Sequence, residues 1–262
     1  KLALTCFLAS YFTRRYDEVR GKKFSAAKPF IVMGVLGVFL LAQPDLGSTV
    51  VLFVITFGML FIVGANFWQF ILLIGTGILL FVWLVLSASY RLKRFTGFLE
   101  PFKDPYGTGF QLTNSLMAFG RGEISGEGLG NSIQKLDYLP EAHTDFIMAI
   151  IGEEFGFIGI LVVVILLGLL IFRAMKIGRE SLMLEQRFRG FFALGISFWI
   201  FFQGFVNLGM ALGMLPTKGL TFPLVSYGGS SIIIMSATVG ILLRIDHENR
   251  LQRGGQARLR DD

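Results

Sequence analysis

Four carboxylates and one of the two histidines of the chain lie close together in the segment LPEAHTDFIMAIIGEE, residues 139–154. Glu141 and Asp145 precede a long apolar run, whereas Glu153 and Glu154 lie inside it. A carboxylate that water can reach is able to act as a general base, but a carboxylate in an apolar helix is costly unless it is paired. The segment therefore combines candidate catalytic acids with two acids that need partners.

Asp145 has two readings from the residues alone. Pro140 cannot extend a helix backwards, so Thr144 or Asp145 is a suitable N-cap for the helix that follows. A cap explains one acid but leaves Glu141 and His143 without a role. The residues therefore keep both interpretations open, a helix cap and a catalytic carboxylate.

Glu153 and Glu154 lie roughly 12–14 Å further along the helix than Asp145, at 1.5 Å per residue. We expect them to be structural acids paired inside a helix bundle, or members of a polar pathway. The glycine-rich GEGLGN at 126–131 follows no predicted strand, so a turn-rich loop is favoured over a phosphate-binding loop.

The composition is that of a polytopic α-helical membrane protein. Hydrophobic residues make up 53% of the 262 residues and charged residues 16%, whereas soluble domains contain about 25% charged residues. The formal net charge is +6, but the positive charge lies in short segments between apolar runs, which argues against nucleic-acid binding. A single cysteine, Cys6, excludes a disulfide framework within the chain and a metal-binding cysteine cluster.

The apolar runs predict an all-α bundle of transmembrane helices. We expect one partial span at 2–12, followed by six complete spans at 29–42, 46–64, 68–88, 146–172, 190–214 and 222–243. We read residues 1–262 as a single membrane domain, a fragment whose earlier N-terminal helices are missing.

Basic residues predict the orientation of the bundle. Six lie in 13–28, five in 173–189 and five in the tail 244–262. Short loops rich in Lys and Arg stay in the cytoplasm, so these three segments are expected on the cytoplasmic side. The long segment 89–145 is then a periplasmic loop, which we expect to be ordered and functional.

Asp45 is expected to have a structural role. The apolar run before Pro44 is short for a span, and Asp45 can cap the helix that begins after it. A partly buried carboxylate needs a partner, and we predict a polar pair with the hydroxyl of Ser230 or Ser231.

Three segments of the chain resemble the signature motifs of the SEDS family, which includes RodA, FtsW and SpoVE. They are AQPDLGS, FGRGEISGEGLGNSIQKLDYLPEAHTDFIMAIIGEE and LPTKGLTFPLVSYGGSS, and the last two are most similar to the division branch of the family. The resemblance implies a ten-helix bacterial inner-membrane enzyme that polymerises lipid II into glycan strands at the division septum. It also implies a class B penicillin-binding protein and other divisome membrane proteins as partners, and Asp145 as the catalytic residue.

The reaction implied is an inverting hexosyl transfer, in which a sugar 4-hydroxyl attacks an anomeric carbon and undecaprenyl pyrophosphate leaves. It needs one base and positive charge at the leaving group. Asp145 is the expected base. The residues expected to bind lipid II or the nascent glycan are Arg91, Arg94, Gln111, Arg121, Lys135, Glu141, His143, Thr144 and Lys218.

Three points stay open from the sequence. Lys218 is equally compatible with a plain surface lysine. A divalent cation, Mg²⁺ or Mn²⁺, is compatible with the acids but not assigned to any of them. A lipid II flippase and a non-catalytic divisome scaffold remain alternative functions, and an assay of glycan polymerisation separates both from a polymerase.

Overall fold

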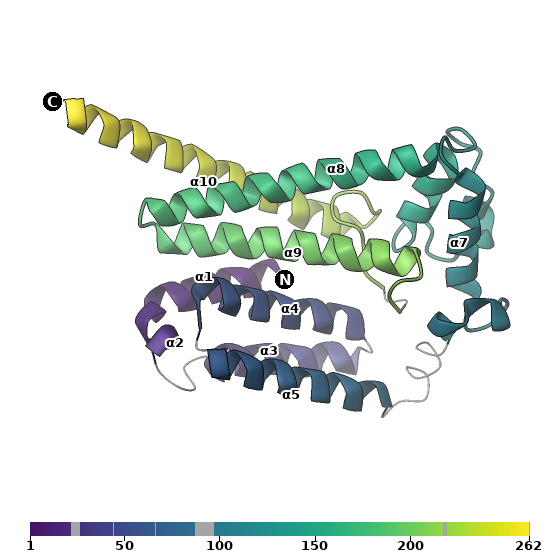
Figure 1. The fold of residues 1–262 in the computed structure, drawn as a ribbon, viewed down its shortest axis with the longest axis horizontal. Coiled ribbons are helices and arrows are strands. Elements are labelled where there is room, and N and C mark those ends of the chain that lie inside the picture. The colour runs from purple at the N-terminus through teal and green to yellow at the C-terminus, as the bar shows by residue number, and fades with distance from the viewer. Residues whose placement is uncertain (22–26, 44, 66, 87–96, 217–218, 262) are drawn as a thin grey trace. The chain divides into compact units, whose positions relative to one another are not determined.

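The computed structural model describes residues 1–21, 27–43, 45–65, 67–86, 97–216 and 219–261. No strand occurs among these residues (Figure 1). The helices are α1 (Leu2–Arg14), α2 (Tyr16–Gly21), α3 (Ala27–Ala42), α4 (Leu46–Val63), α5 (Phe67–Leu86), α7 (Phe110–Gly122), α8 (Ile147–Met183), α9 (Arg187–Ala211) and α10 (Gly229–Asp261). A 3-10 turn, η1 (Pro101–Lys103), and a π-helical turn, η2 (Gln134–Tyr138), flank α7 in the sequence.

The chain forms two compact units. The first contains residues 1–75, 169–201 and 233–262, and the second contains residues 76–168 and 202–232. The segment 139–154 and its surroundings belong to the second unit, which is therefore the part of the protein that contains the candidate site.

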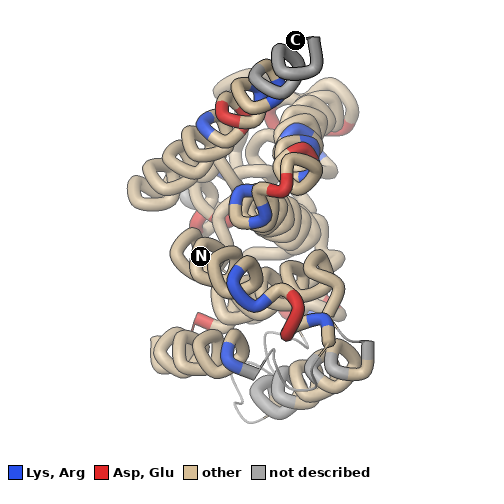
Figure 2. Tube along the Cα trace, turned by 90° about the vertical axis from the view of Figure 1, so that its left-hand side faces the viewer, with Lys and Arg blue, Asp and Glu red and all other residues tan. Residues whose placement is uncertain are grey.

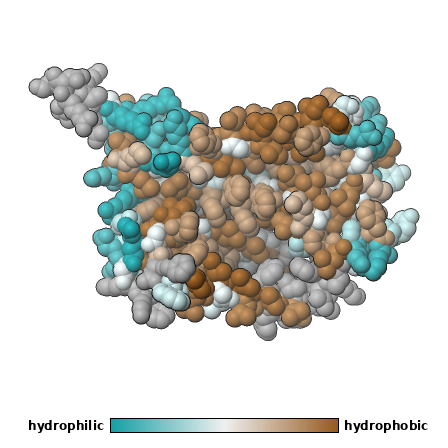
Figure 3. Space-filling model, in the orientation of Figure 1, coloured by the Kyte–Doolittle hydropathy of each residue, from teal (hydrophilic) through white to brown (hydrophobic). Residues whose placement is uncertain are grey.

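Four of the six predicted complete spans are confirmed by length and composition. Leu46–Val63, Ile147–Met183, Arg187–Ala211 and Gly229–Gly254 are long and apolar enough to cross a membrane. The other two predicted spans correspond to α3, with 16 residues, and to α5, an apolar helix of 20 residues. Along the middle of α8 the visible surface is mostly hydrophobic (Figure 3), as expected of a helix that faces lipid.

The first unit confirms the predicted helix boundary at Asp45. Asp45 is the N-cap of α4, and its Oδ1 accepts the backbone N–H of Ser48 at 2.8 Å. Gly64 ends the same helix in the left-handed conformation, with φ of 78°. Helix α4 packs against α1 and α3 (Figure 1), so the cap fixes the start of a helix in the middle of this group.

Polar contacts also join α8 to α10 within the first unit. Arg173 of α8 donates to both carboxylate oxygens of Asp246 of α10, at 3.0 and 2.9 Å. Ser181 and Asn249 are both fully buried and hydrogen-bond each other. Charged residues gather towards the helix ends and the connections between helices (Figure 2), which is the distribution that apolar spans require.

Two segments contain more helix than the sequence indicated. The predicted loop 89–145, described from residue 97 onward, includes the 13-residue helix α7. The predicted tail 244–262 continues α10 as a helix as far as Asp261. The turn-rich character of 126–131 is confirmed, since Gly126, Gly128 and Gly130 all have positive φ.

Cysteine labelling in cells tests the orientation. In a Cys6→Ala background, an impermeant thiol reagent should modify Ser125→Cys from outside, because 89–145 is predicted to be periplasmic. Met183→Cys should react only after the membrane is permeabilised. Both positions are exposed, with 71% for Met183, whereas Ser181 nearby is too buried to report. External labelling of Met183→Cys but not of Ser125→Cys would overturn the orientation.

Candidate active site

Helix α8 is broken at Gly156, where φ is 64° and ψ is −162°. A break in a helix frees backbone groups that must find other partners, because unpaired buried N–H and C=O groups are costly. Residues 123–128 supply them. The N–H groups of Glu127 and Gly128 donate to the carbonyls of Glu153 and Glu154, and the N–H groups of Phe157 and Ile158 donate to the carbonyls of Glu123 and Ile124, at distances of 2.9–3.2 Å.

Two glycines make this close approach feasible. Gly126 has φ of 79°, and a Cβ there would lie 2.2 Å from the carbonyl oxygen of Glu154. A Cβ at Gly156 would lie 2.4 Å from the carbonyl oxygen of Ile124. Neither backbone conformation nor space admits a side chain at these positions. Residues 121–135, which we call the outer segment, are therefore attached to α8 through main-chain contact.

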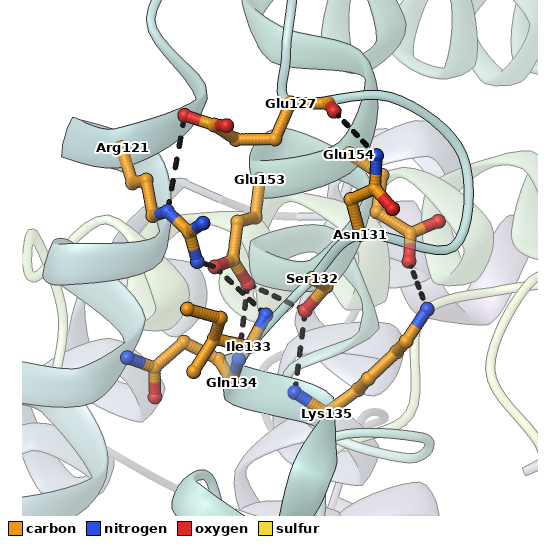
Figure 4. A network of polar contacts seen from close by, with 9 residues as sticks. All are labelled: Arg121, Glu127, Asn131, Ser132, Ile133, Gln134, Lys135, Glu153 and Glu154. Carbon is orange, nitrogen blue, oxygen red and sulfur yellow. Dashed lines mark hydrogen bonds and ion pairs between the residues drawn. The ribbon is translucent and has the colours of Figure 1, made fainter.

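Glu153 is fully buried, and its carboxylate points towards Arg121 and Ser132 (Figure 4). It accepts four hydrogen bonds, which come from Arg121 Nη1 at 3.0 Å, Ser132 Oγ at 2.5 Å, Ile133 N at 3.1 Å and Gln134 N at 3.2 Å. Four donors, one of them a guanidinium, offset the cost of removing a carboxylate from water. Glu153 thus organises the outer segment from Arg121 to Gln134.

Glu154 forms the second ion pair of the network. Its Oε1 lies 2.5 Å from Lys135 Nζ (Figure 4). As expected of structural acids, Glu153 and Glu154 both have basic partners. The partners come from the outer segment, however, and not from the interior of a helix bundle as the sequence suggested. Arg121 and Lys135 thus form ion pairs with Glu153 and Glu154. The role in substrate binding that the sequence suggested for these two residues stays a prediction.

Asp145 lies in the turn 141–146, immediately before α8. The carbonyl of Glu141, a residue with φ of 56°, accepts the N–H groups of Thr144, Asp145 and Phe146 at 3.1–3.2 Å. Thr144 Oγ1 also donates to the Glu141 carboxylate at 2.6 Å. Glu141 thus holds the turn through its main chain and its side chain, while the Asp145 side chain is half-buried.

Apolar packing places this turn against two helices of the second unit. Phe146 and Ala142 pack in one buried cluster with Ala118 of α7 and Ala211 at the end of α9. On the polar side, Asn207 of α9 donates from Nδ2 to the carbonyl oxygen of Asp145 at 2.8 Å. The turn is therefore fixed on both sides.

The segment that follows α9 also approaches Asp145. A Cβ placed on Gly219 would lie 3.4 Å from Asp145 Oδ2, so the backbone of this segment lies close to the carboxylate. Gly219 follows Lys218 in the sequence, and Lys218 lies outside the described residues. The same holds for Arg91 and Arg94, so the roles predicted for these three cations stay predictions.

The structure brings some of the predicted site residues together and separates others. Glu141, His143, Thr144 and Asp145 share one turn. Gln111 is half-buried in the first turn of α7. The expected pair of Asp45 with Ser230 or Ser231 stays a prediction, because Asp45 and the serines belong to different units. Ser231 Oγ lies 3.4 Å from Thr221 Oγ1.

Sequence reasoning missed Asn207 and Gln203, two buried amides in the apolar helix α9. Gln203 Nε2 donates to the carbonyl of Thr221 at 2.8 Å, and Asn207 contacts the turn of Asp145. A polar residue in an apolar span is a functional candidate by default, so both were detectable. Ser132 and Ser226 carried no such signal, because serine is common in loops.

Comparison with known proteins places the chain in a family. The family described as "Cell cycle protein", comprising FtsW, RodA and SpoVE, matches residues 1–251. Two relatives, each called "Probable peptidoglycan glycosyltransferase FtsW", come from Haemophilus influenzae, with 87% identity, and Pasteurella multocida, with 84% identity. All of this chain aligns with each of them and covers 66% of their length.

Two solved structures share the fold. One belongs to a study of "polymerization and crosslinking by a peptidoglycan synthase complex", with a TM-score of 0.73 and 29% identity over 95% of this chain and 68% of the other. The second is the rod shape determining protein RodA of Thermus thermophilus, with a TM-score of 0.60 and 25% identity over 94% of this chain and 64% of the other. The all-helical, polytopic membrane fold predicted from the sequence is confirmed.

Replacing Glu153 tests the network around it. Glu153→Ala should lower the free energy of unfolding by about 1–3 kcal/mol, because buried donors lose their acceptor. Glu127→Ala is the matched control, since its carboxylate is exposed and lies 3.8 Å from Arg121 Nε. That variant should stay within about 0.5 kcal/mol of wild type. Denaturation in detergent measures both, and equal stability of the two variants would contradict the role of Glu153.

Proposed function

Because the chain belongs to the FtsW, RodA and SpoVE family of cell cycle proteins, we propose that it is the core of a peptidoglycan glycosyltransferase. The proposed reaction is polymerisation of lipid II into glycan strands. The names of the relatives at 84% and 87% identity support this proposal, and the chain spans 66% of their length.

The observation that carries the proposal is the position of Asp145. Its side chain is half-buried, so it remains accessible to a substrate, and it lies in a turn that α7, α9 and the Glu141 contacts hold in place. A catalytic group must be held within about 0.5 Å of its productive position, which a fixed turn on packed helices provides.

In the proposed reaction, Asp145 is the general base. Its carboxylate accepts the proton of the acceptor sugar's 4-hydroxyl as that oxygen forms a bond to the anomeric carbon of the donor. The bond between this carbon and the pyrophosphate oxygen breaks, and undecaprenyl pyrophosphate leaves as an anion. Inversion follows from this single displacement, and no second protonating carboxylate is needed because the leaving group is already acidic.

Positive charge must stabilise the leaving pyrophosphate. Arg91, Arg94 and Lys218 are our candidates, because Arg121 and Lys135 already pair with Glu153 and Glu154. Two of the candidates are arginines, whose guanidinium groups bind phosphate oxygens in a bidentate manner. The backbone near Lys218, at Gly219, lies close to the Asp145 carboxylate, which favours Lys218 within this set.

The sequence left a divalent cation open. Across the parts of the chain that the structure describes, no three His, Cys, Asp or Glu side chains are grouped so that they could hold a metal ion. The residues described therefore offer no fitted site, and the proposed steps use only the protein's own groups.

We further propose that the enzyme acts in the bacterial inner membrane at the division septum, with its active site on the periplasmic face. A class B penicillin-binding protein and other divisome membrane proteins are the proposed partners. The structural relative with a TM-score of 0.73 comes from a peptidoglycan synthase complex that coordinates polymerisation with crosslinking, which supports a crosslinking partner for this chain.

The two alternative functions gain less support. A lipid II flippase would use intramembrane acids along a transport path, but Glu153 and Glu154 are paired with the outer segment. A scaffold would need no accessible carboxylate in a fixed turn. Neither alternative produces glycan, so a polymerisation assay decides between them and the proposed enzyme.

Asp145→Asn tests the proposed function. The amide preserves the size of the side chain but lacks basicity, and a positioned base is typically worth about 10²–10⁴-fold in rate. Polymerisation of lipid II by the full-length protein with its partner should therefore fall by at least about 100-fold. Asp104→Asn, which changes an exposed aspartate bonded to Thr108, should keep wild-type activity. Wild-type activity of Asp145→Asn would show that Asp145 is only structural.

A further inference from the structure

The three consecutive carbonyls of His143, Thr144 and Asp145 each accept a hydrogen bond from a different donor outside the turn. The N–H of Tyr227 donates to the carbonyl of His143 at 2.9 Å. Ser226 Oγ donates to the carbonyl of Thr144 at 2.5 Å, and Asn207 Nδ2 to that of Asp145 at 2.8 Å. The donors come from α9 and from the segment 220–227, far from the turn in sequence, and all belong to the second unit.

Both side-chain donors are themselves anchored. Asn207 is fully buried, and its Nδ2 also donates to the carbonyl of Leu220 at 2.5 Å. Ser226 is 2% exposed, and its Oγ accepts the N–H of Phe222 at 2.6 Å. Each side chain therefore joins the turn of Asp145 to the segment 220–227, which is in turn fixed to α9.

We propose that Asn207 and Ser226 are positioning residues for Asp145, acting through the main chain of the turn. The inference rests on the proposed function, in which Asp145 is the base. Fixed carbonyls at 143–145 fix the direction of the Asp145 Cα–Cβ bond, and hence where its carboxylate can lie. Both residues are too buried to touch a substrate, so their effect on the reaction is indirect.

The chemistry of Asn207 suits this role. Its amide nitrogen carries two N–H groups. They donate to the carbonyl oxygens of Asp145 and Leu220, which belong to the two segments that Asn207 joins. Oδ1 of Asn207 is buried without a hydrogen-bond partner in the described part of the chain. The amide nitrogen, as the donor, therefore links the turn of Asp145 to the segment 220–227. An aspartate of the same size would present only oxygens to the two carbonyls and would add a negative charge beside Asp145.

Serine variants give the first test, with the full-length protein, its partner and lipid II. Ser226→Ala should lower kcat with little change in KM, since a misplacement of about 1 Å costs about 10²-fold in rate. Ser226→Thr, which keeps the hydroxyl, should recover most of the loss. Ser181→Ala is the matched control, because Ser181 is also fully buried and donates to a carbonyl, that of Ile177, at 3.0 Å, but belongs to the first unit, which does not contain the turn. It should lower thermal stability as much as Ser226→Ala but leave kcat near wild type.

Asn207→Asp gives a second, nearly isosteric variant. Its kcat should fall at least as much as that of Ser226→Ala. Asn207→Leu removes the N–H donors without adding a charge, and its kcat should also be low. If Ser226→Ala and the Asn207 variants keep the kcat of Ser181→Ala, both residues are only structural and the positioning role is wrong. If they are slow but Asp145→Asn is fully active, the positioning role is wrong as well, because the proposed base has failed. A low kcat of the Ser226 and Asn207 variants, together with an inactive Asp145→Asn, supports both the positioning role and the proposed function.

Discussion

Backbone hydrogen bonding at the break of α8 is the constraint on which the outer segment and the two acids paired with it depend. Gly156 interrupts the helix, and residues 123–128 pair with the backbone groups that the break leaves without intrahelical partners. In an apolar environment no water is available to hydrogen-bond these N–H and C=O groups, so the outer segment must pair with them. The same docking brings Arg121 to Glu153 and encloses a carboxylate that would otherwise be very costly.

This docking separates two kinds of acid within one short stretch of sequence. Glu153 and Glu154 lie before the break and form structural ion pairs, whereas Asp145 lies in the preceding turn and is half-buried. Helix α8 has 37 residues in two parts that meet at the break at Gly156. Residues 157–172, after the break, form an apolar stretch about 24 Å long.

Hydropathy and helix signals predicted most of the fold, because spans follow from composition and Asp45 is a strong N-cap. They did not predict α7, which lies among mixed polar and apolar residues in a long connection. The break at Gly156 was also missed, since glycine in an apolar helix usually serves packing. Partners of Glu153 lie 19–32 residues away, and Asn207 lies 62 residues from Asp145. Contacts over such separations depend on tertiary structure, which local patterns do not contain.

Hydrogen exchange over residues 141–150 tests most directly whether the turn of Asp145 is held from outside. The N–H groups of Thr144, Asp145 and Phe146 all donate to the carbonyl of Glu141, so they exchange only when the turn opens. We expect faster exchange in this peptide for Ser226→Ala than for wild type, and a wild-type rate for Ser181→Ala, whose change lies in the first unit. Equal exchange in wild type and Ser226→Ala would show that the turn is rigid by itself and would contradict the proposed role of its outside donors.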